Sequence, residues 1–366
     1  MTSNISNPLA LIAELTHRCP LHCVYCSNPM ELTRSDGELS TDVWMRVFRE
    51  AAELGVLQID FTGGEPLARS DLVELIRGAR GAGLYVNLIT SGIPLNEERL
   101  AALIGAGLDH FQLSFQDAWE ESASEFSGTR THAKKKRVAE WVKQHCVALT
   151  LNFVIHRQNL DRLEAMIELT EQIEPNRVEF AHVQYYGWAF ANRERLLPTR
   201  QQLDLSLETL RKAEQKLRGR TRVEYVVPDY YAAYPKACMG GWGRKVLLVK
   251  PSGEAMPCHA ADVIPGMVFE NVRTGSLRQI WHESDAFRKF RGEDWMREPC
   301  RSCDRRLQDF GGCRCQAFLI ANDALATDPV CSLSDRRTSV DSVLAQVNAV
   351  PSTIATAEWL YRQNPL

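Results

Sequence analysis

The sequence has no long apolar run, no excess of basic residues and no low-complexity segment. No apolar run reaches the roughly 18 residues that cross a bilayer, and 43 basic against 46 acidic residues give a formal net charge of −3. Phosphate backbones and anionic membrane surfaces attract basic proteins, so neither nucleic acid nor a membrane is expected as a partner. The first ten residues lack the basic start and apolar core of a secretory signal, and we therefore expect a cytoplasmic protein.

Cysteine, in contrast, is abundant. The chain carries 11 cysteines in 366 residues, whereas proteins of a reducing compartment rarely keep disulfides. Binding of a metal or an iron-sulfur cluster is thus the expected use of these thiols. The remaining composition, 45% hydrophobic and 24% charged, is that of a globular protein, and the length predicts two domains.

Residues 8–198 are expected to form the first domain, because short apolar runs alternate there with longer amphipathic stretches, as in repeated β/α units. The six expected strands are Ala10–Leu15, Gln58–Thr62, Tyr85–Thr90, His110–Phe115, Ala148–Ile155 and Arg177–Ala181. The five expected helices are Thr41–Leu54, Asp71–Ala82, Glu97–Ile104, Lys134–Gln144 and Leu160–Ile173. Right-handed crossovers then give a parallel sheet covered by helices. The predicted fold class is α/β, a partial (β/α)6 barrel two units short of a closed TIM barrel.

The second half of the chain changes in character. A long polar helix over Thr199–Leu217 is expected to open a bridging segment, residues 199–237. Residues 238–334, which are rich in glycine, tryptophan and arginine, hold seven of the cysteines and form the expected second domain. Residues 335–366 follow as a tail with one amphipathic stretch, Ser339–Val347.

Three cysteines, Cys19, Cys23 and Cys26, follow the first expected strand in the pattern CxxxCxxC. Three thiolates on one short loop can hold a four-iron cluster and leave one iron open for chemistry, whereas a structural zinc site needs four ligands. The loop lies at the carboxyl end of a strand, where barrel enzymes place their active sites. A catalytic cluster is therefore favoured, and a zinc or disulfide site remains the alternative.

The ends of the next strands carry polar candidates for ligand binding. In Gly63-Gly64-Glu65-Pro66, the glycines allow close approach of a ligand to the backbone, and carbonyl or carboxylate oxygens can accept hydrogen bonds from an ammonium group. An ordinary turn is the alternative for this motif. Hydroxyl and amide groups that could reach a ribose follow the third and fourth strands; they belong to Ser91, Ser114 and Gln116.

The CxxxCxxC loop followed by Gly-Gly-Glu-Pro resembles the radical S-adenosylmethionine (SAM) superfamily, whose cluster loop also carries an aromatic residue before the last cysteine, here Tyr25. The resemblance implies a [4Fe-4S] cluster held by the three cysteines and a SAM molecule at its open iron. It also implies that Gly63, Gly64 and Glu65 hold the amino group of SAM.

The later cysteines resemble the SPASM extension of peptide-modifying radical SAM enzymes, which binds two auxiliary iron-sulfur clusters, [2Fe-2S] or [4Fe-4S]. The sequence departs from that pattern in two places, with Asp309 where a cysteine is usual and with the additional Cys315. The resemblance implies two four-ligand sites. One consists of Cys238, Cys258, Cys313 and Cys315, and the other of Cys300, Cys303, Asp309 and Cys331. A carboxylate is a harder ligand than a thiolate and should alter the reduction potential of its cluster. An ordinary exposed carboxylate at Asp309 and a two-zinc domain remain the alternatives.

Several further stretches, among them Met239-Gly-Gly-Trp-Gly-Arg and Cys300-Arg-Ser-Cys-Asp-Arg-Arg, look like a family of enzymes in pyrroloquinoline quinone (PQQ) biosynthesis. The resemblance implies a carbon-carbon cross-link between a glutamate and a tyrosine of a ribosomal precursor peptide, with an auxiliary cluster removing the surplus electron. It also implies a peptide chaperone protein and a reductant such as flavodoxin as partners. Another SPASM peptide maturase, forming thioethers or formylglycine, and a non-enzymatic iron-sulfur or zinc protein are the competing hypotheses.

Four other features are open to two interpretations. The basic run Lys134–Arg137 is expected to be a solvated face, with docking of an acidic peptide as the alternative. Cys146 has no partner spacing and is expected to be buried as a small apolar residue. His259 adjoins a predicted ligand and either bonds cluster sulfur or lies in a turn. Aromatic residues after the sixth strand line a peptide site or belong to the core; they are Tyr185, Tyr186 and Trp188.

Overall fold

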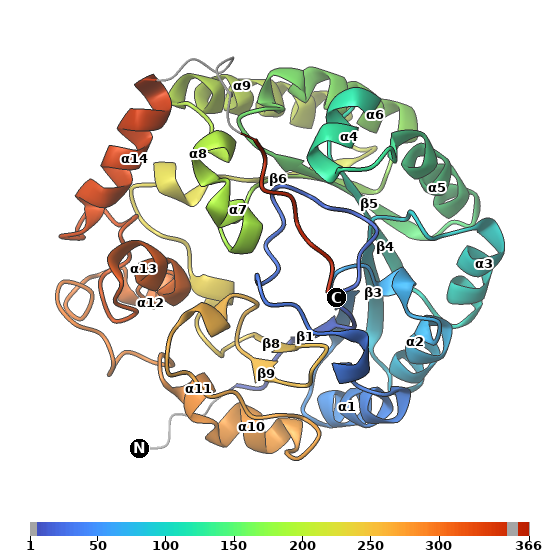
Figure 1. The fold of residues 1–366 in the computed structure, drawn as a ribbon, viewed down its shortest axis with the longest axis horizontal. Helices are drawn as coiled ribbons and strands as arrows, with labels where there is room; N and C mark the ends of the chain where they lie inside the picture. The colour runs from blue at the N-terminus through green and yellow to red at the C-terminus, as the bar shows by residue number, and fades with distance from the viewer. Residues whose placement is uncertain (1–5, 350–357, 366) are drawn as a thin grey trace.

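The computed structural model describes residues 6–349 and 358–365, and a single curved sheet lies at its centre (Figure 1). The first six strands are parallel and pair in chain order. They are β1 (Ala10–Glu14), β2 (Gln58–Thr62), β3 (Tyr85–Thr90), β4 (His110–Phe115), β5 (Ala148–Ile155) and β6 (Arg177–His182). The predicted partial barrel is therefore confirmed, with strand boundaries that differ from the expected ones by a single residue at most.

Helices cover the outer face of this sheet and form the ring seen in Figure 1. The barrel helices are α1 (Thr41–Glu53), α2 (Leu72–Gly81), α3 (Glu97–Gly105), α4 (Glu120–Ser127), α5 (His132–Gln144) and α6 (Leu163–Ile173). In α1 the buried residues Trp44, Val47, Phe48 and Ala51 recur at helical spacing and face the sheet. Within the described ranges, every helix is too short or too polar to cross a lipid bilayer.

The sheet continues beyond the six predicted strands at both edges. At one edge β7 (Arg222–Val226) pairs in parallel with β6, and α9 (Arg200–Leu217) packs against α6 and β7. At the other edge β8 (Val246–Val249) pairs in parallel with β1, and β9 (Ala255–Met256) pairs antiparallel with β8. The segment expected to bridge two domains thus adds a seventh parallel strand, and the second domain shares the sheet of the first.

The second domain has few regular elements and its own apolar core. Two short helices, α7 (Gly187–Ala191) and α8 (Arg193–Leu196), precede α9, and the later ones are α10 (Leu277–Glu283), α11 (Asp285–Arg288), α12 (Arg306–Asp309), α13 (Arg314–Ala321) and α14 (Arg337–Ala349). Trp242, Phe290 and Met256 pack in this core together with Cys258 and Cys315. Two thiols of the second domain, Cys258 and Cys315, are thus part of its interior.

The tail expected at 335–366 begins with α14, and residues 350–357 and 366 lie outside the described part. Residues 358–365 run back across the barrel to the centre of the face seen in Figure 1, beside the segment that follows β1. Tail and barrel are joined by hydrogen bonds between Asn192 and the main chain of Leu360, at 2.8 and 3.1 Å.

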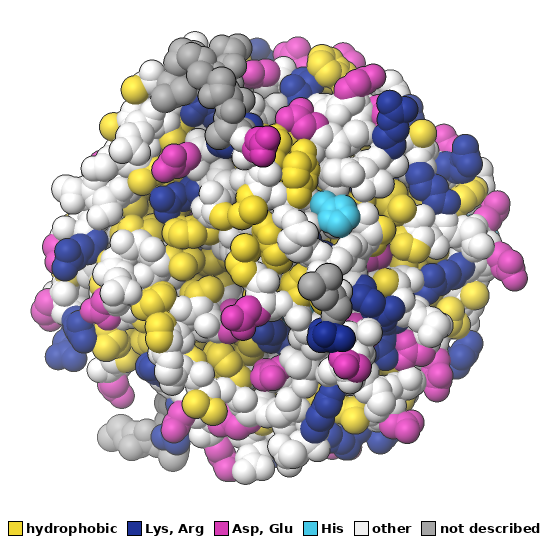
Figure 2. Space-filling view, in the orientation of Figure 1, with side chains coloured by type: hydrophobic (Ala, Val, Ile, Leu, Met, Phe, Trp, Pro, Cys, Tyr) yellow, Lys and Arg dark blue, Asp and Glu magenta, His cyan; other side chains and the backbone are white. Residues whose placement is uncertain are grey.

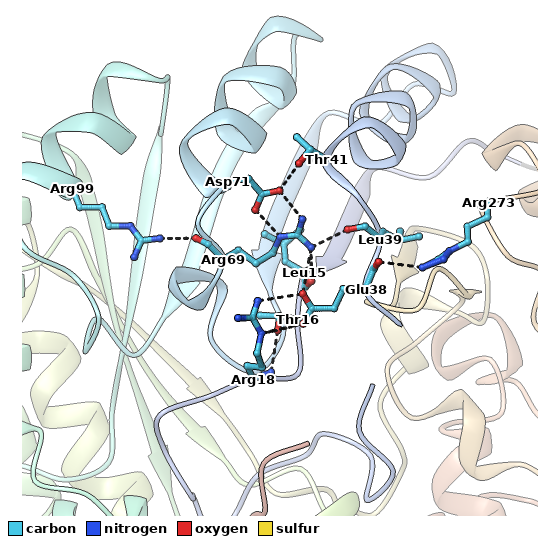
Figure 3. A network of polar contacts seen from close by, with 10 residues as sticks. All are labelled: Leu15, Thr16, Arg18, Glu38, Leu39, Thr41, Arg69, Asp71, Arg99 and Arg273. Atoms are coloured by element: carbon cyan, nitrogen blue, oxygen red, sulfur yellow. Dashed lines mark hydrogen bonds and ion pairs between the residues drawn. The ribbon is translucent and has the colours of Figure 1, made fainter. Parts of the chain in front are cut away.

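A buried arginine holds the loops around the end of β1 together (Figure 3). Arg69 is 7% exposed and donates to both carboxylate oxygens of Asp71, at 2.8 and 2.6 Å. It also donates to the main-chain oxygen of Leu15 at 3.3 Å and lies 3.6 Å from Glu38, which pairs with Arg18. A buried cation with this many acceptors is well satisfied, and the network fixes the start of the cysteine loop.

The prediction that Cys146 is buried is wrong. Its side chain is exposed, in the turn after α5, and its φ is +57°. The residue ends a helix in the left-handed conformation and does not begin β5, so the apolar strand that follows does not carry it into the core.

Candidate functional site

A cavity of about 280 Å³ opens at the carboxyl ends of the barrel strands. Its wall includes Cys19, Cys23 and Cys26, which we call the loop set. Six of the seven residues predicted to contact a cofactor also line it, namely Tyr25, Gly63, Gly64, Ser91, Ser114 and Gln116. Because parallel strands end at one rim, residues far apart in sequence meet there.

The thiols of the loop set lie in surroundings that oppose ionisation. Burial raises the pKa of Cys19, Cys23 and Cys26, to about 12 for Cys23. The positive charge of Arg362, a tail residue that lines the same cavity, opposes this rise for all three thiols. Thiols of this kind stay protonated until a metal replaces the proton.

The two glycines pack against the cysteine loop. A Cβ on Gly64 would lie 2.5 Å from the main-chain oxygen of Arg18 and 2.6 Å from that of His17. Gly63 has φ +133°, and a Cβ there would collide with the main-chain oxygen of Thr16. The amide of Gly64 donates to this same Thr16 oxygen at 2.6 Å. Both positions therefore require glycine, because the two backbone segments are in direct contact here.

Glu65, the seventh predicted cofactor contact, lies beneath the cavity and not among its lining residues. Its carboxylate is fully buried and accepts from the Thr90 hydroxyl at 2.6 Å, the Ser91 amide at 2.8 Å and the Leu67 amide at 3.0 Å; the Ser91 hydroxyl also bonds it. In this arrangement Glu65 holds Ser91 at the rim. Sequence reasoning found the residue but not this set of partners.

The sequence predicted that the basic run at the start of α5 is a solvated face. The structure shows that one residue of the run is buried. Lys135 is 1% exposed and donates to the main-chain oxygen of Ser114 and to Oε1 of Gln116, both at 2.6 Å. Burial lowers its pKa to about 8, although the nearby Cys23 opposes the fall. The residue orients Gln116 at the wall of the cavity.

The second domain brings four thiols into contact. Cys238, Cys258, Cys313 and Cys315, which we call the ring set, hydrogen-bond one another in a closed ring. Hydrogen bonds from the Cys238 and Cys315 thiols lower the pKa of Cys258 and Cys313. The Tyr186 hydroxyl lies 3.0 Å from Sγ of Cys313, whereas Tyr185 and Trp188 are buried in the core.

The remaining ligand candidates line a second, separate cavity. Cys300, Cys303, Asp309 and Cys331, which we call the aspartate set, all face it. Asp309 is 8% exposed, accepts from the Gly311 amide at 3.0 Å and lies 3.5 Å from Arg305. The structure therefore brings these four side chains to one cavity, and their role as ligands stays a prediction.

Asp328, which sequence reasoning missed, connects the ring set with the aspartate set. Its carboxylate accepts from the amides of Cys313 at 2.8 Å and Val330 at 3.0 Å, and it lines the cavity of the aspartate set. Burial raises its pKa to about 6, and the neighbouring Cys313 adds to the rise. No local pattern marks this aspartate, because its contacts with Cys313 and Gln316 come from a different part of the chain.

A charged contact joins the end of β1 to the ring set. Glu14 lies 3.1 Å from Nδ1 of His259 and 3.6 Å from Nε2 of His17. Burial raises the pKa of Glu14, but the hydrogen bonds and charges of the two histidines outweigh burial and bring it to about 2. Burial lowers the pKa of His259, and Glu14 outweighs that effect and raises it to about 9. His259, which follows Cys258, thus bonds a carboxylate of the barrel.

The donor chemistry of the three sets suits iron-sulfur clusters. Soft thiolates favour iron-sulfur clusters, zinc and copper, and a cluster distributes its ligands over several irons. The described residues contain no group of three or more His, Cys, Asp or Glu side chains that could hold a single metal ion. By the chemistry of their donors, the residues of each set fit an iron-sulfur cluster.

A hydrophobic area adjoins the main cavity. Hydrophobic side chains gather on the left half of the face in Figure 2, over α7 and α13. A small hollow there is lined by Tyr186, Phe190 and Ile320, and it shares Val183 and Gln184 with the wall of the main cavity. The area and the cavity thus adjoin each other, with Val183 and Gln184 in the walls of both.

Known proteins resemble this chain in both sequence and fold. The Radical SAM superfamily pattern matches residues 13–170, and an iron-sulfur cluster-binding domain called SPASM matches residues 238–304. A PqqA peptide cyclase of Rhizobium meliloti is 53% identical over 348 residues, covering 95% of this chain and 92% of that relative. A PqqA peptide cyclase of Granulibacter bethesdensis is 52% identical over 333 residues, covering 91% and 89%.

Among solved structures, Streptococcus suis SuiB bound to SAM superposes with a TM-score of 0.75 at 18% identity, covering 90% of this chain and 78% of SuiB. SuiB bound to its precursor peptide SuiA gives the same TM-score at 17% identity, with 90% and 77% covered. At this identity the superposition concerns the fold, and it includes both the barrel and the second domain.

Proposed function

This chain belongs to the PqqA peptide cyclase family of radical SAM enzymes, and on that basis we propose that it joins a glutamate and a tyrosine side chain of one ribosomal precursor peptide by a carbon-carbon bond. The observation that carries the proposal is the 53% identity to a PqqA peptide cyclase over 95% of the chain. The enzyme binds SAM at an iron-sulfur cluster and carries auxiliary iron-sulfur clusters in its SPASM domain.

The loop set would hold the SAM-binding cluster, of the [4Fe-4S] type. Support comes from the three thiols on one wall of the cavity, with Gly63, Gly64, Ser91, Ser114 and Gln116 around them. When bound, the cluster and SAM supply a deoxyadenosyl radical, which removes a hydrogen atom from an unactivated carbon. The chain positions the peptide carbon beside the cavity and excludes water and other hydrogen donors.

The ring set and the aspartate set would hold two auxiliary clusters, one each, of the [2Fe-2S] or [4Fe-4S] type. Support comes from the contacts among the four ring thiols and from the shared cavity of the aspartate set. Cross-linking removes one hydrogen from the glutamate γ-carbon and one from the tyrosine ring, so an electron acceptor is needed in addition to the radical. Clusters buried in the SPASM domain suit that role.

The precursor peptide would approach over the hydrophobic area between α7 and α13. This area adjoins the cavity through Val183 and Gln184. An extended peptide with apolar residues can bury them there and pass its reactive side chains into the cavity. A peptide chaperone and a reductant such as flavodoxin belong to the same proposal, as does a cytoplasmic location, where reducing conditions maintain free thiols.

Product mass tests the proposed function. The enzyme with reconstituted clusters, PqqA peptide, SAM and a strong reductant should yield a peptide two hydrogens lighter, with the cross-link located by fragmentation between a glutamate and a tyrosine. The same reaction without SAM is the control. Deoxyadenosine formation with an unchanged peptide mass would contradict the proposal and would favour another peptide substrate. A thioether in the product would favour a different SPASM maturase.

Replacing Asp309 tests the aspartate set. Asp309→Ala should change the electron paramagnetic resonance spectrum of one auxiliary cluster only, because the residue lines the cavity of one set. Asp304→Ala is the matched control, since Asp304 belongs to the same cysteine-rich stretch but is exposed. If the spectrum of Asp309→Ala equals that of the wild type, the carboxylate is not a ligand.

A further inference from the structure

The described C-terminal segment, residues 358–365, is anchored to the cysteine loop. The Cys19 amide donates to Oδ1 of Asn364 at 3.1 Å, and Nδ1 of His22 lies 2.8 Å from the main-chain oxygen of Arg362. Asn192 bonds both the Leu360 oxygen and the Val24 oxygen, at 2.8 and 2.7 Å. The end of the chain thus follows the loop that carries Cys19, Cys23 and Cys26.

This segment carries a guanidinium into the cavity. Arg362 is 1% exposed and lines the same cavity as the three thiols. It donates to the main-chain oxygen of His17 and to Oδ1 of Asn364, the latter at 2.9 Å, and it lies 5.8 Å from the Trp188 ring. Its Nε is buried without a hydrogen-bond partner in the described part of the chain.

No carboxylate of the described residues lies within ion-pair distance of Arg362, whereas Arg69, a buried arginine near the end of β1, pairs with Asp71 and Glu38. A guanidinium taken out of water without an anion costs several kcal/mol. Neutral carbonyl oxygens compensate only part of that cost. The arrangement indicates an anion that is bound beside Arg362 in the active protein.

An iron-sulfur cluster held by the loop set would be such an anion. A four-iron cluster with three thiolate ligands is negative when oxidised and gains one further negative charge on reduction. A fixed cation in a cavity of low dielectric stabilises the more negative form more strongly.

We propose that Arg362, delivered by the C-terminal tail, balances the charge of the loop-set cluster and raises its reduction potential. This inference rests on the proposed assignment of Cys19, Cys23 and Cys26 to that cluster. Arg362 is thus a positioning and charge-balancing residue from the opposite end of the chain. The carboxylate of SAM is the other anion that could meet the same guanidinium, and the experiment distinguishes the two.

The test is a redox titration of the full-length enzyme with all clusters, followed by electron paramagnetic resonance. The loop-set signal is the one that is missing when Cys19, Cys23 and Cys26 are replaced together. Without SAM, Arg362→Gln should lower the ratio of reduced to oxidised cluster about tenfold at a fixed potential, which is a shift of 59 mV for a one-electron couple. Arg362→Lys keeps the charge and should stay close to the wild type.

Tyr361→Phe is the control for docking of the tail, because it removes only the hydroxyl bond to the Glu125 oxygen. An unchanged potential in Arg362→Gln would overturn the proposal, and if SAM binding alone weakens, the guanidinium serves the SAM carboxylate. A fall of equal size in Arg362→Lys or in Tyr361→Phe would overturn it as well. If Arg362→Gln loses the loop-set cluster and Arg362→Lys keeps it, the positive charge is what the cluster needs, and the proposal is supported.

The titrations use no peptide, so they do not depend on which peptide the enzyme modifies. A failed cross-linking assay with a shifted potential would reject the proposed substrate and keep the role of Arg362. Successful cross-linking with an unshifted potential would keep the proposed substrate and reject the role of Arg362.

Discussion

Replacement of Cys19, Cys23 and Cys26 together by alanine is expected to abolish formation of deoxyadenosine and to remove one of three clusters. The three thiols share one cavity wall, whereas the ring set and the aspartate set lie elsewhere in the chain and in space. The iron content should therefore fall without reaching zero. Anaerobic reconstitution, iron analysis and an assay for deoxyadenosine measure the two effects.

Cys146→Ala is the matched control for this variant. Cys146 is exposed and belongs to none of the three sets. Its replacement should change neither iron content nor deoxyadenosine formation. Continued SAM cleavage by the triple variant would contradict the assignment of the loop set, and complete loss of iron would indicate that the auxiliary clusters depend on it.

Gly64→Ala is expected to reduce SAM cleavage by about a hundredfold or more. The added Cβ would lie 2.5 Å from the Arg18 oxygen, directly before Cys19, and backbone atoms at that distance have to move. A displacement of about 1 Å at a reacting centre is enough for a loss of this size. Deoxyadenosine formation per loop-set cluster measures it.

The same variant separates two roles for the glycine pair. If packing against the cysteine loop is what matters, Gly64→Ala should lose part of the loop-set cluster even without SAM. If the glycine only contacts SAM, the cluster should stay intact and SAM binding alone should weaken. Gly105→Ala is the control, because a Cβ there meets no atom within 4 Å, and we expect a stability change within about 0.5 kcal/mol.

The six barrel strands could be predicted from the sequence because each is a short run of five to eight residues with apolar residues that are consecutive or alternate with polar ones. β7 was not predicted, although Arg222 and Glu224 alternate with apolar residues as Arg177 and Glu179 do in β6. The difference lies in burial, since β6 has three buried residues and every residue of β7 is at least partly exposed. β7 forms because β6 presents an unpaired edge, which is a tertiary condition.

The candidate site could be predicted where the spacing of residues in the sequence forms a recognisable motif. The CxxxCxxC loop and the Gly63-Gly64 pair stand at strand ends, and the structure brings them to one cavity. Lys135 was not predictable, because a buried lysine inside a basic run has the same sequence pattern as a solvated face. Its burial depends on acceptors from Ser114 and Gln116 on another element. No sequence pattern places Arg362 beside the cysteine loop, since it lies 336 residues after Cys26.

The position of β1 has a mechanical consequence. This strand is hydrogen-bonded to β2 of the barrel on one side and to β8 of the SPASM domain on the other. Domains joined by a linker rotate about it, but here the joint is a sheet, and a slip of one residue would turn every side chain to the other face. The seam between the two domains is therefore stiff. It keeps the distance between the loop set and the ring set constant. With the proposed clusters bound at both sets, electrons would cross that fixed distance.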